Sequence, residues 1–289
     1  MLKSLKKNIV LTQAVLIVFV LICTANLGVV RKVNAMPFYD LRPQEMVLRA
    51  EFCTYYSSST SERKHNIMLA SKALNNTFID VGAEFSFNLT VGERTAKKGY
   101  KTSKIIVAGE FVDGVGGGVC QVSTTLYNAV LLAGLKVLEY HPHSLPVSYV
   151  APSFDAMVNS NSADLRFMNN THNPLIIKTS ADEQKLVVKI YGEKLTETYV
   201  RKSQITEKIA PPEYQVVLDE RGEFPDLFEG ESRVIKYAKE GYKSEGYIIV
   251  MRKGEQVAVK KIRTDKYAPS QGKIVVGTMV KEVENSKSE

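Results

Sequence analysis

The stretch Gly114–Leu135 constrains the fold of this chain more than any other segment. It reads GVGGGVCQVSTTLYNAVLLAGL, so a cluster of glycines runs directly into a cysteine and then into an apolar segment. Glycine adopts backbone conformations that side chains forbid, and it lets another group approach the backbone closely. After Cys120 the apolar residues recur at helical spacing, which predicts a helix with its C-terminal cap at Gly134.

Cys120 therefore lies at or just before the first turn of the predicted helix. The unpaired N–H groups and the positive end of the helix dipole favour a thiolate there. Downstream, His143 stands between two predicted strands, Lys136–Tyr140 and Leu145–Val150, and Asp155 follows after a further turn. Papain-like, transglutaminase-like and NlpC-type cysteine enzymes share this order, with a His that activates the thiol and a third polar group that orients the His.

The catalytic interpretation makes Cys120 the nucleophile, His143 the base and Asp155 the group that orients the base. Gln121 or the backbone N–H groups of the first turn would stabilise an oxyanion, and the chemistry would be acyl transfer or amide hydrolysis. The alternative is a binding or structural role, because a free cysteine often only packs. The separation of 23 residues between Cys120 and His143 is also shorter than is usual in those enzymes.

Residues around the glycine cluster are candidates for ligand binding. Arg94 is the best candidate for anion recognition, because a guanidinium pairs with a carboxylate at two points; pairing with an acidic neighbour is the structural alternative. The glycines would serve either a tight turn or a bound glycan. The predicted binding residues are Arg94, Gly116, Gly117, Gly118, Gln121 and Ser144. No metal and no cofactor are expected, because Cys120, His141 and His143 show no repeat of ligand spacing.

About half of the chain closely resembles the VanW-like proteins, a family of cell-envelope proteins of mostly Gram-positive bacteria. The family is named after a member of vancomycin-resistance gene clusters. The resemblance centres on the glycine cluster and Cys120 and follows one order along the chain. The matching residues include Phe52–Tyr56, Arg63, Asn66-Ile67, Phe85–Asn88, Val91–Thr95, Gly99-Tyr100, Pro142–Ser144, Val147, Tyr149-Val150, Asp155-Ala156, Asp164-Leu165, Phe167, Asn169–Thr171 and Pro174. The resemblance implies an envelope protein and assigns no settled chemistry.

Two departures from the family pattern lie close to the candidate site. Tyr140 stands where many relatives have an arginine before Pro-His-Ser. Residues 151–153 and 160–162 replace stretches that are usually richer in glycine. The loop geometry around Asp155 is therefore the part of the candidate triad that the resemblance supports least.

The N-terminal residues carry a membrane signal. Lys3, Lys6 and Lys7 precede Ile9–Val30, a run of 22 residues without charge, which as a helix would span about 33 Å. The basic flank predicts a cytoplasmic N-terminus with the rest of the chain outside the cell. A cleaved signal peptide is the alternative, because Val33-Asn34-Ala35 offers a cleavage site. Both interpretations export the remainder, either as a single-pass membrane protein or as a secreted one.

The charge of the chain limits its possible partners, and its cysteine content indicates whether disulfides are expected. The formal net charge is +7, but the three lysines before the apolar run account for part of it, and no dense basic stripe remains. Nucleic acid is therefore excluded as a partner. Cys53 and Cys120 are the two cysteines beyond the apolar run. Two cysteines are too few for a disulfide framework, so both thiols are expected to be free.

Beyond Pro211-Pro212 the sequence resembles the G-five domain, a small β-module named for its glycines that often accompanies VanW-like domains. The matching residues are Glu229-Gly230, Gly241-Tyr242, Gly246-Tyr247, Gly254, Tyr267–Pro269 and Val276–Thr278. Two alternating runs around Lys253-Gly254-Glu255 predict a hairpin, and Lys273–Val276 a last strand. Such modules are associated with binding of N-acetylglucosamine-containing polymers; Tyr242, Tyr247 and Tyr267 would then stack on a sugar, or else pack the core of the module.

The expected fold is α+β: one transmembrane helix, a mixed, mostly antiparallel VanW-like domain with two principal helices, and a small all-β module. Phe85–Asn88 is expected to be a strand with both phenylalanines on one face. The expected ranges are 1–35 for the cytoplasmic tail and anchor, 45–195 for the VanW-like domain, 208–281 for the β-module and 282–289 for a disordered tail.

Two functions follow as hypotheses. The first is an exported, membrane-anchored envelope protein that binds peptidoglycan or its precursors, with a link to wall metabolism or glycopeptide resistance. Its partners would be cell-wall glycan and, through the N-terminal helix, the cytoplasmic membrane. The second is a cysteine hydrolase or transpeptidase that acts on wall peptides through Cys120 and His143.

Overall fold

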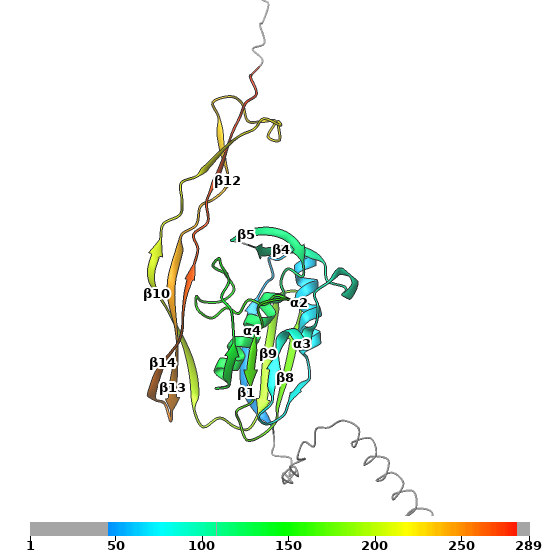
Figure 1. Ribbon diagram of the computed structural model, residues 1–289, viewed down its shortest axis with the longest axis vertical. Helices are drawn as coiled ribbons and strands as arrows, with labels where there is room; N and C mark the ends of the chain where they lie inside the picture. The colour runs from blue at the N-terminus through cyan, green and yellow to red at the C-terminus, as the bar shows by residue number, and fades with distance from the viewer. Residues whose placement is uncertain (1–45, 108, 282–289) are drawn as a thin grey trace, which may run out of the picture. The chain divides into compact units, whose positions relative to one another are not determined.

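The computed structural model describes residues 46–107 and 109–281 (Figure 1). The predicted membrane segment, residues 1–35, and the predicted disordered tail, residues 282–289, lie outside the described residues. Within the described ranges, none of the helices has the length and apolarity needed to cross a membrane.

The core of the first half is a four-stranded antiparallel sheet in the order β1-β9-β8-β2 (Figure 1). Its strands are β1 (Val47–Tyr55), β2 (Thr77–Ile79), β8 (Leu175–Ala181) and β9 (Lys185–Gly192). In β9, Leu186, Val188 and Ile190 are buried, with less buried residues between them. Because side chains alternate between the two faces of a strand, this period of two gives the sheet one face for the core.

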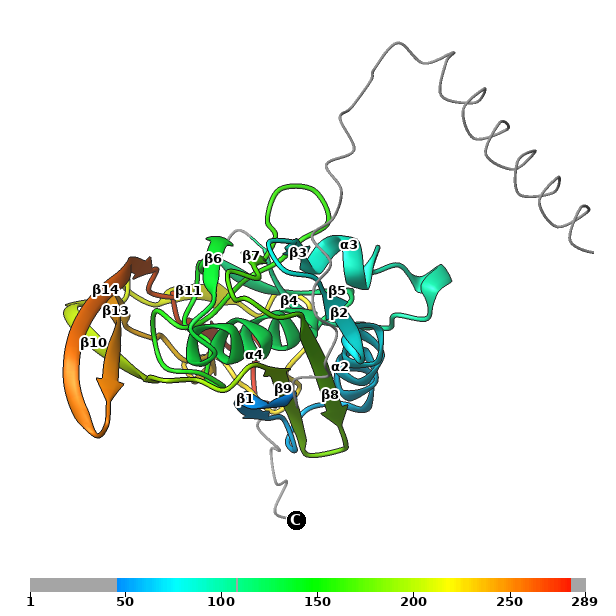
Figure 2. The ribbon, with the colours of Figure 1, turned by 90° about the horizontal axis from the view of Figure 1, so that it is seen from below.

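Two principal helices pack on this sheet, as predicted: α2 (Ser61–Leu74) contacts β8, and α4 (Val119–Leu132) contacts β1 and β9 (Figure 2). Helix α4 is buried along almost its whole length, polar residues included. Those polar residues are satisfied by specific partners, as in the 2.8 Å hydrogen bond between the hydroxyls of Thr125 and Thr54. A buried polar group without such a partner would cost stability, so these bonds fix α4 in one position.

Helix α4 begins and ends near the residues that the sequence indicates. Its C-cap is Ala133, and Gly134 follows with φ of +68°. A Cβ on Gly134 would also lie 2.5 Å from the ring of Tyr199. Glycine is therefore required at this position both for the left-handed backbone and for the close approach of the aromatic ring.

Smaller elements complete this half of the molecule. A second sheet has the order β3-β7-β6, from β3 (Glu84–Ser86), β6 (Lys136–Glu139) and β7 (Arg166–Met168). The strand expected at Phe85–Asn88 ends early, because the Ser86 side chain accepts the N–H of Leu89 and caps helix α3 (Phe87–Val91). Between α3 and α4 lie the 3-10 turn η1 (Ala96–Lys98) and the hairpin of β4 (Thr102–Val107) and β5 (Glu110–Val115).

The prediction of a strand at Leu145–Val150 is wrong, because no strand covers these residues in the structure. Prolines at 142, 146 and 152 interrupt this part of the chain. Proline has no N–H to donate to a strand ladder, so the segment folds as an irregular loop instead. The loop is held by individual bonds, such as that from Met157 N to His141 O at 2.7 Å.

The C-terminal part consists of two three-stranded sheets. The larger one, β10-β13-β14, is antiparallel and comprises β10 (Thr198–Ile209), β13 (Gly241–Arg252) and β14 (Glu255–Tyr267). The smaller one has the order β11-β15-β12, from β11 (Gln215–Leu218), β12 (Ser232–Lys236) and β15 (Lys273–Val276), with β11 and β15 parallel. The predicted hairpin and last strand are confirmed. The chain is thus a mixed α+β protein with mostly antiparallel sheets and an all-β C-terminal region.

The strand β10 begins before Pro211-Pro212 and joins this region to α4. Arg201, on β10, donates a hydrogen bond to the side chain of Asn128 on α4. Its guanidinium also lies over the rings of Phe52 and Phe154, 4.2 Å and 4.9 Å from their centroids. Cation–π contacts of this kind are strongest where water is excluded, so Arg201 links the two halves of the described fold.

Candidate functional site

The first turn of α4 places Cys120 next to a tightly packed backbone. Gly118 is the N-cap with φ of +111°, and a Cβ there would lie 3.0 Å from the carbonyl oxygen of Arg63. Asn66 on α2 holds the preceding residue, because its Nδ2 donates to Gly117 O at 2.9 Å. The glycine cluster therefore serves a tight turn that sets where the helix, and with it Cys120, begins.

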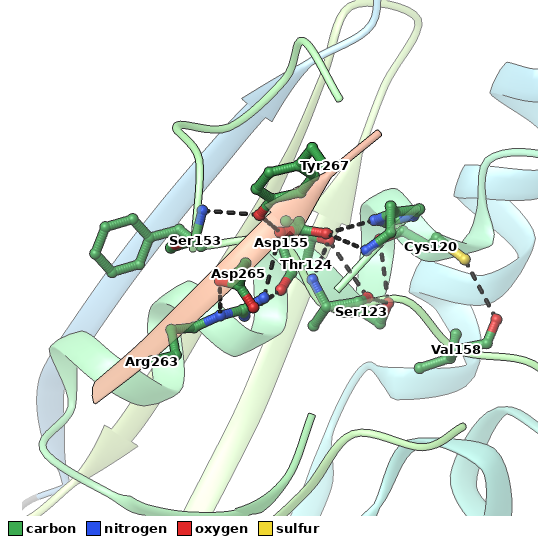
Figure 3. A network of polar contacts seen from close by, with 12 residues as sticks. Cys120, Ser123, Thr124, Ser153, Asp155, Val158, Arg263, Asp265 and Tyr267 are labelled. Atoms are coloured by element: carbon green, nitrogen blue, oxygen red, sulfur yellow. Dashed lines mark hydrogen bonds and ion pairs between the residues drawn. The ribbon is translucent and has the colours of Figure 1, made fainter. Parts of the chain in front are cut away.

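The structure brings Cys120, His143 and Asp155 together, although they lie far apart along the chain. The Asp155 carboxylate accepts hydrogen bonds at 2.7 Å from both the backbone N and the Nδ1 of His143. The imidazole of His143 lies close enough to the Cys120 thiol to lower the pKa of that thiol. The thiol in addition contacts Val158 O at 3.3 Å (Figure 3).

Burial differs among the three residues. His143 is 5% exposed and Asp155 is 1% exposed, whereas Cys120 is only partly buried. Both described cysteines, Cys53 and Cys120, are free, as predicted. Cys120 is thus the least buried of the three residues.

The electrostatics of the site favour an ion pair between thiolate and imidazolium. Burial raises the pKa of the Cys120 thiol, but the hydrogen bond and charge of His143 outweigh burial, and the pKa lies below its ordinary value. Burial lowers the pKa of His143, but hydrogen bonds to Asp155 and Cys120 outweigh it and raise the pKa to about 9. Both shifts favour the form with the proton on the imidazole, in which the sulfur is nucleophilic.

Asp155 is held by two residues of β14 as well as by His143. The Tyr267 hydroxyl donates to Asp155 Oδ1 at 2.5 Å, and Arg263 donates from Nη1 to the Asp155 carbonyl oxygen at 2.6 Å (Figure 3). The Arg263 Nη2 lies 3.5 Å from the same Oδ1. Burial raises the pKa of Asp155, but His143, Arg263 and Tyr267 together lower it below its ordinary value, so the carboxylate is ionised.

Helix α4 also fixes the loop that carries Asp155. Ser123 donates to Ala156 O at 2.5 Å, and Thr124 accepts the N–H of Ala156 at 2.9 Å. Asn128 donates to Phe154 O at 2.8 Å. One face of α4 therefore positions both the nucleophile candidate and the backbone on each side of the candidate carboxylate, which is the rigid support that such a site requires.

The predicted binding residues have different positions. Arg94 is half-buried near Cys120; its Nη1 donates to Asn88 Oδ1 at 2.8 Å and to Gly92 O at 3.0 Å, and the thiolate is its strongest charged neighbour. A Cβ on Gly116 would lie 3.0 Å from the Cβ of Arg94, so these two predicted residues are in contact. Arg94 is therefore paired with uncharged oxygens rather than with an acidic neighbour.

Gln121 and Ser144 have structural partners. Gln121 is 1% exposed, and its Nε2 donates to Thr54 Oγ1 at 3.1 Å and Tyr55 O at 3.0 Å. Both amide hydrogens are used, so the structure does not present this side chain as an oxyanion donor. Ser144 is exposed, and its backbone oxygen accepts the N–H of Ala268 at 2.8 Å.

Three residues at the site were not predicted for it. Burial raises the pKa of Tyr149, and the nearby Cys120 thiolate raises it further. Arg263 and Tyr267 come from β14, more than 100 residues from Asp155 in the sequence. Tyr267 is 1% exposed, so of its two expected roles the packing one holds and stacking on a sugar is excluded. Residues 263, 265 and 267 are every second residue of the strand, so their three polar side chains lie on one strand face. This spacing is the sequence signal that could have identified Arg263 and Tyr267.

Comparison with protein families gives two matches. Residues 62–191 match a family described as VanW like protein, and residues 200–279 match the G5 domain. The chain therefore contains a VanW-like domain followed by a G5 domain.

Two curated proteins are similar to part of this chain. The Uncharacterized protein YoaR of Bacillus subtilis is 41% identical over 152 residues, which cover 53% of this chain and 50% of that protein. The Vancomycin B-type resistance protein VanW of Enterococcus faecalis is 26% identical over 154 residues, which cover 49% of this chain and 56% of that protein. The chain spans about half the length of the curated relatives it matches.

Two solved structures are each similar to a part of this chain. The IgA1 Protease G5 domain structure is 28% identical, covers 30% of this chain and 99% of its own, and has a TM-score of 0.18. The HP0197-G5 crystal structure is 20% identical, covers 28% of this chain and 97% of its own, and has a TM-score of 0.15.

Proposed function

We propose that this chain, a VanW-like domain followed by a G5 domain, is a cysteine acyl-transfer enzyme of the cell envelope. Cys120 would be the nucleophile, His143 the acid and base, and Asp155 the residue that orients His143. The observation that carries the proposal is the position of His143: its Nδ1 lies 2.7 Å from Asp155 Oδ2, and its imidazole lies close enough to the Cys120 thiol to lower the pKa of that thiol. This is the relation between nucleophile, base and orienting group that covalent catalysis requires.

The reaction would proceed through a thioester. The Cys120 thiolate attacks the carbonyl carbon of an amide, and the carbonyl oxygen takes up the negative charge of the tetrahedral intermediate. The N–H groups in the first turn of α4 and the positive end of its dipole are the candidates to stabilise that charge. His143 then gives its proton to the leaving amine as the C–N bond breaks. Water or a second amine, deprotonated by His143, attacks the thioester and releases the thiol.

The proposed substrates are peptides of the cell wall. One relative is named a vancomycin resistance protein, and glycopeptide resistance concerns the wall. Arg94 would bind a carboxylate of such a peptide, because its half-buried guanidinium lies near Cys120 and pairs only with uncharged oxygens in the described residues. A guanidinium offers more donors than these two bonds use.

A wall-binding protein without catalysis is the second candidate. The nearly complete burial of His143 and Asp155 favours it, since a buried network also stabilises a scaffold. In that case the chain would bind peptidoglycan or its precursors, with the G5 domain as part of the binding surface. Export and anchoring through the apolar segment near the N-terminus belong to either proposal.

The test uses the full-length chain with Cys23→Ser and Cys53→Ser, so that Cys120 is the remaining thiol. Iodoacetamide alkylation is followed from pH 5 to 10 by mass spectrometry. The enzyme proposal predicts rapid alkylation with an apparent thiol pKa well below about 8.5, and loss of this reactivity in His143→Ala. A thiol that reacts only after denaturation would eliminate the enzyme and leave the binding protein.

A second measurement addresses the chemistry directly. The chain is incubated with muropeptides that carry stem peptides, quenched in acid and analysed for a mass increase on Cys120. An acyl adduct that is absent in Cys120→Ala supports acyl transfer. A reactive thiol that never forms an adduct with any stem peptide would contradict wall peptides as the substrate class.

A further inference from the structure

We infer that Arg263 and Tyr267 of β14 are positioning residues for the Cys120–His143 pair and act through Asp155. The G5 region would then contribute residues to the proposed active site. This inference rests on the proposed function and names the groups that complete its site.

The two oxygens of the Asp155 carboxylate have separate partners. Oδ2 accepts both hydrogen bonds from His143, at 2.7 Å each. Oδ1 accepts the hydroxyl of Tyr267 at 2.5 Å and faces Arg263 Nη2 at 3.5 Å. A carboxylate that is bonded on one oxygen only is free to turn about its χ2 angle, whereas one bonded on both oxygens is fixed. Tyr267 therefore completes the orientation that His143 depends on.

Arg263 fixes the backbone at the same residue. Its bond to the Asp155 carbonyl oxygen at 2.6 Å holds the main chain, while Tyr267 OH also accepts the N–H of Ser153 at 2.8 Å. The loop around Asp155 is thus tied to β14 at two backbone positions as well as at the carboxylate (Figure 3). Without β14, helix α4 would be left as the main support of this loop.

Arg263 itself is prevented from moving. Its side chain is fully buried, its Nε donates to Asp265 Oδ2 at 2.6 Å, and its guanidinium lies 4.4 Å from the ring centroid of Tyr140. Burying a guanidinium with two carboxylates costs desolvation that an apolar pair would avoid. A contact that served only to join two modules would not need this cluster of charges next to a buried His–Asp pair.

A positioning role and a purely electrostatic role predict opposite results for Tyr267→Phe. Removing a donor from Asp155 makes the carboxylate a stronger base, so an electrostatic role alone would strengthen its bond to His143 and lower the thiol pKa further. If Tyr267 positions Asp155, the imidazole loses its fixed place beside the sulfur, and the thiol pKa rises toward its ordinary value. The direction of the shift therefore distinguishes the two roles.

The experiment compares Tyr267→Phe and Arg263→Met in the full-length chain that retains Cys120 as its sole thiol. The readout is the pH profile of iodoacetamide alkylation, with urea unfolding measured in parallel. For Tyr267→Phe we expect the thiol pKa to rise by about 0.5 unit or more, and alkylation at pH 7 to slow by about threefold or more. Arg263→Met should have a larger effect. If Arg263→Met does not fold, Tyr267→Phe alone decides.

Matched controls come from the same sheet. Tyr247 donates to Glu245 and Lys261 pairs with Glu245 at 3.1 Å, both away from Asp155. Tyr247→Phe and Lys261→Met should leave the alkylation profile unchanged. A Tyr267→Phe profile that is unchanged, or shifted to lower pH, would overturn the inference, whatever the variant does to stability.

The outcomes also separate this inference from the proposed function. Alkylation needs no wall peptide, so a shifted profile without any acyl adduct would retain the positioning role and reject acyl transfer on those peptides. An acyl adduct that forms equally fast in Tyr267→Phe and in the parent would retain the enzyme and reject the positioning role.

Discussion

Replacing Asn66 by alanine should destabilise the protein through a small number of identifiable groups. Asn66 is fully buried on α2, its Nδ2 donates to Lys101 O and Gly117 O at 2.9 Å each, and its Oδ1 accepts the N–H of Lys101 at 2.8 Å. In Asn66→Ala, the buried Gly117 oxygen has no water to replace the amide, which costs about 1–3 kcal/mol. The groups of the exposed Lys101 are rehydrated and cost about 0.5–1 kcal/mol together.

We therefore expect Asn66→Ala to lower the free energy of unfolding by about 1.5–4 kcal/mol, a large part of the roughly 5–15 kcal/mol typical of a domain. Urea unfolding followed by circular dichroism measures this, and the m-value should stay unchanged. Asn75→Ala is the matched control, because exposed Asn75 accepts one N–H, that of Thr179, at 3.0 Å. If the two variants lose the same stability, the buried bonds of Asn66 do not have the assigned role.

Asn66→Asp sharpens the test because the two side chains have nearly the same volume. The carboxylate would face the carbonyl oxygens of Lys101 and Gly117 with no donor to offer them. Its cost should exceed that of Asn66→Ala, since a buried charge is added to two lost bonds. Wild-type stability in Asn66→Asp would show that the carbonyl oxygens of Lys101 and Gly117 do not need the amide donor. Alkylation of Cys120 should slow in both variants, because Gly117 directly precedes the N-cap of α4.

Three further predictions concern the helix, the core and pH. Gly118→Ala should cost about 1–3 kcal/mol in urea unfolding, because the N-cap has φ of +111° and the new Cβ would lie 3.0 Å from Arg63 O; a loss under about 0.3 kcal/mol would contradict the strain. Leu126→Ala should cost about 2–5 kcal/mol and lower the melting temperature, since this side chain is fully buried on α4; full retention of stability would mean that the site collapses without a cavity. The pKa of His143 is raised to about 9, so its contribution to stability is complete below about pH 6.5 and is lost as pH rises through about 9. The pKa of Asp155 is lowered, so its contribution is present above about pH 3.8 and lost in more acidic solution. The urea midpoints of wild type and Asp155→Asn should differ most between these limits, and the difference should become smaller above pH 9 without vanishing, because Tyr267 still donates to the carboxylate.

The elements that could be predicted are those with signals close together in the sequence. Apolar spacing and a terminal glycine located α4, and Lys253-Gly254-Glu255 located the hairpin of β13 and β14. The failures have local causes too. Ser86 acts as a helix cap and ends the strand expected through Asn88, and the proline-rich segment after His141 forms a loop where a strand was expected.

The candidate triad could be predicted only as an order of residues along the chain. The spacing of apolar residues predicted that Cys120 lies at a helix N-terminus. The loop that brings His143 to Asp155 could not be predicted in this way, because it is held by hydrogen bonds to α4 that have no periodic pattern in the sequence. The contribution of β14 was beyond local reasoning, because Asp155 and Tyr267 are 112 residues apart. Long-range contacts of this kind depend on how two sheets pack, and packing is set by the whole fold.

The spacing of Arg263, Asp265 and Tyr267 on one face of β14 restricts how this protein can evolve by recombination. A β-module from another gene could be joined after residue 195 and still fold, yet it would leave Asp155 without its partners unless it carried an arginine and a tyrosine four positions apart on the matching strand. Sequence changes at 155, 263 and 267 are therefore expected to be inherited together among descendants that keep this pair of domains. The two domains would pass through lineages as one unit of selection.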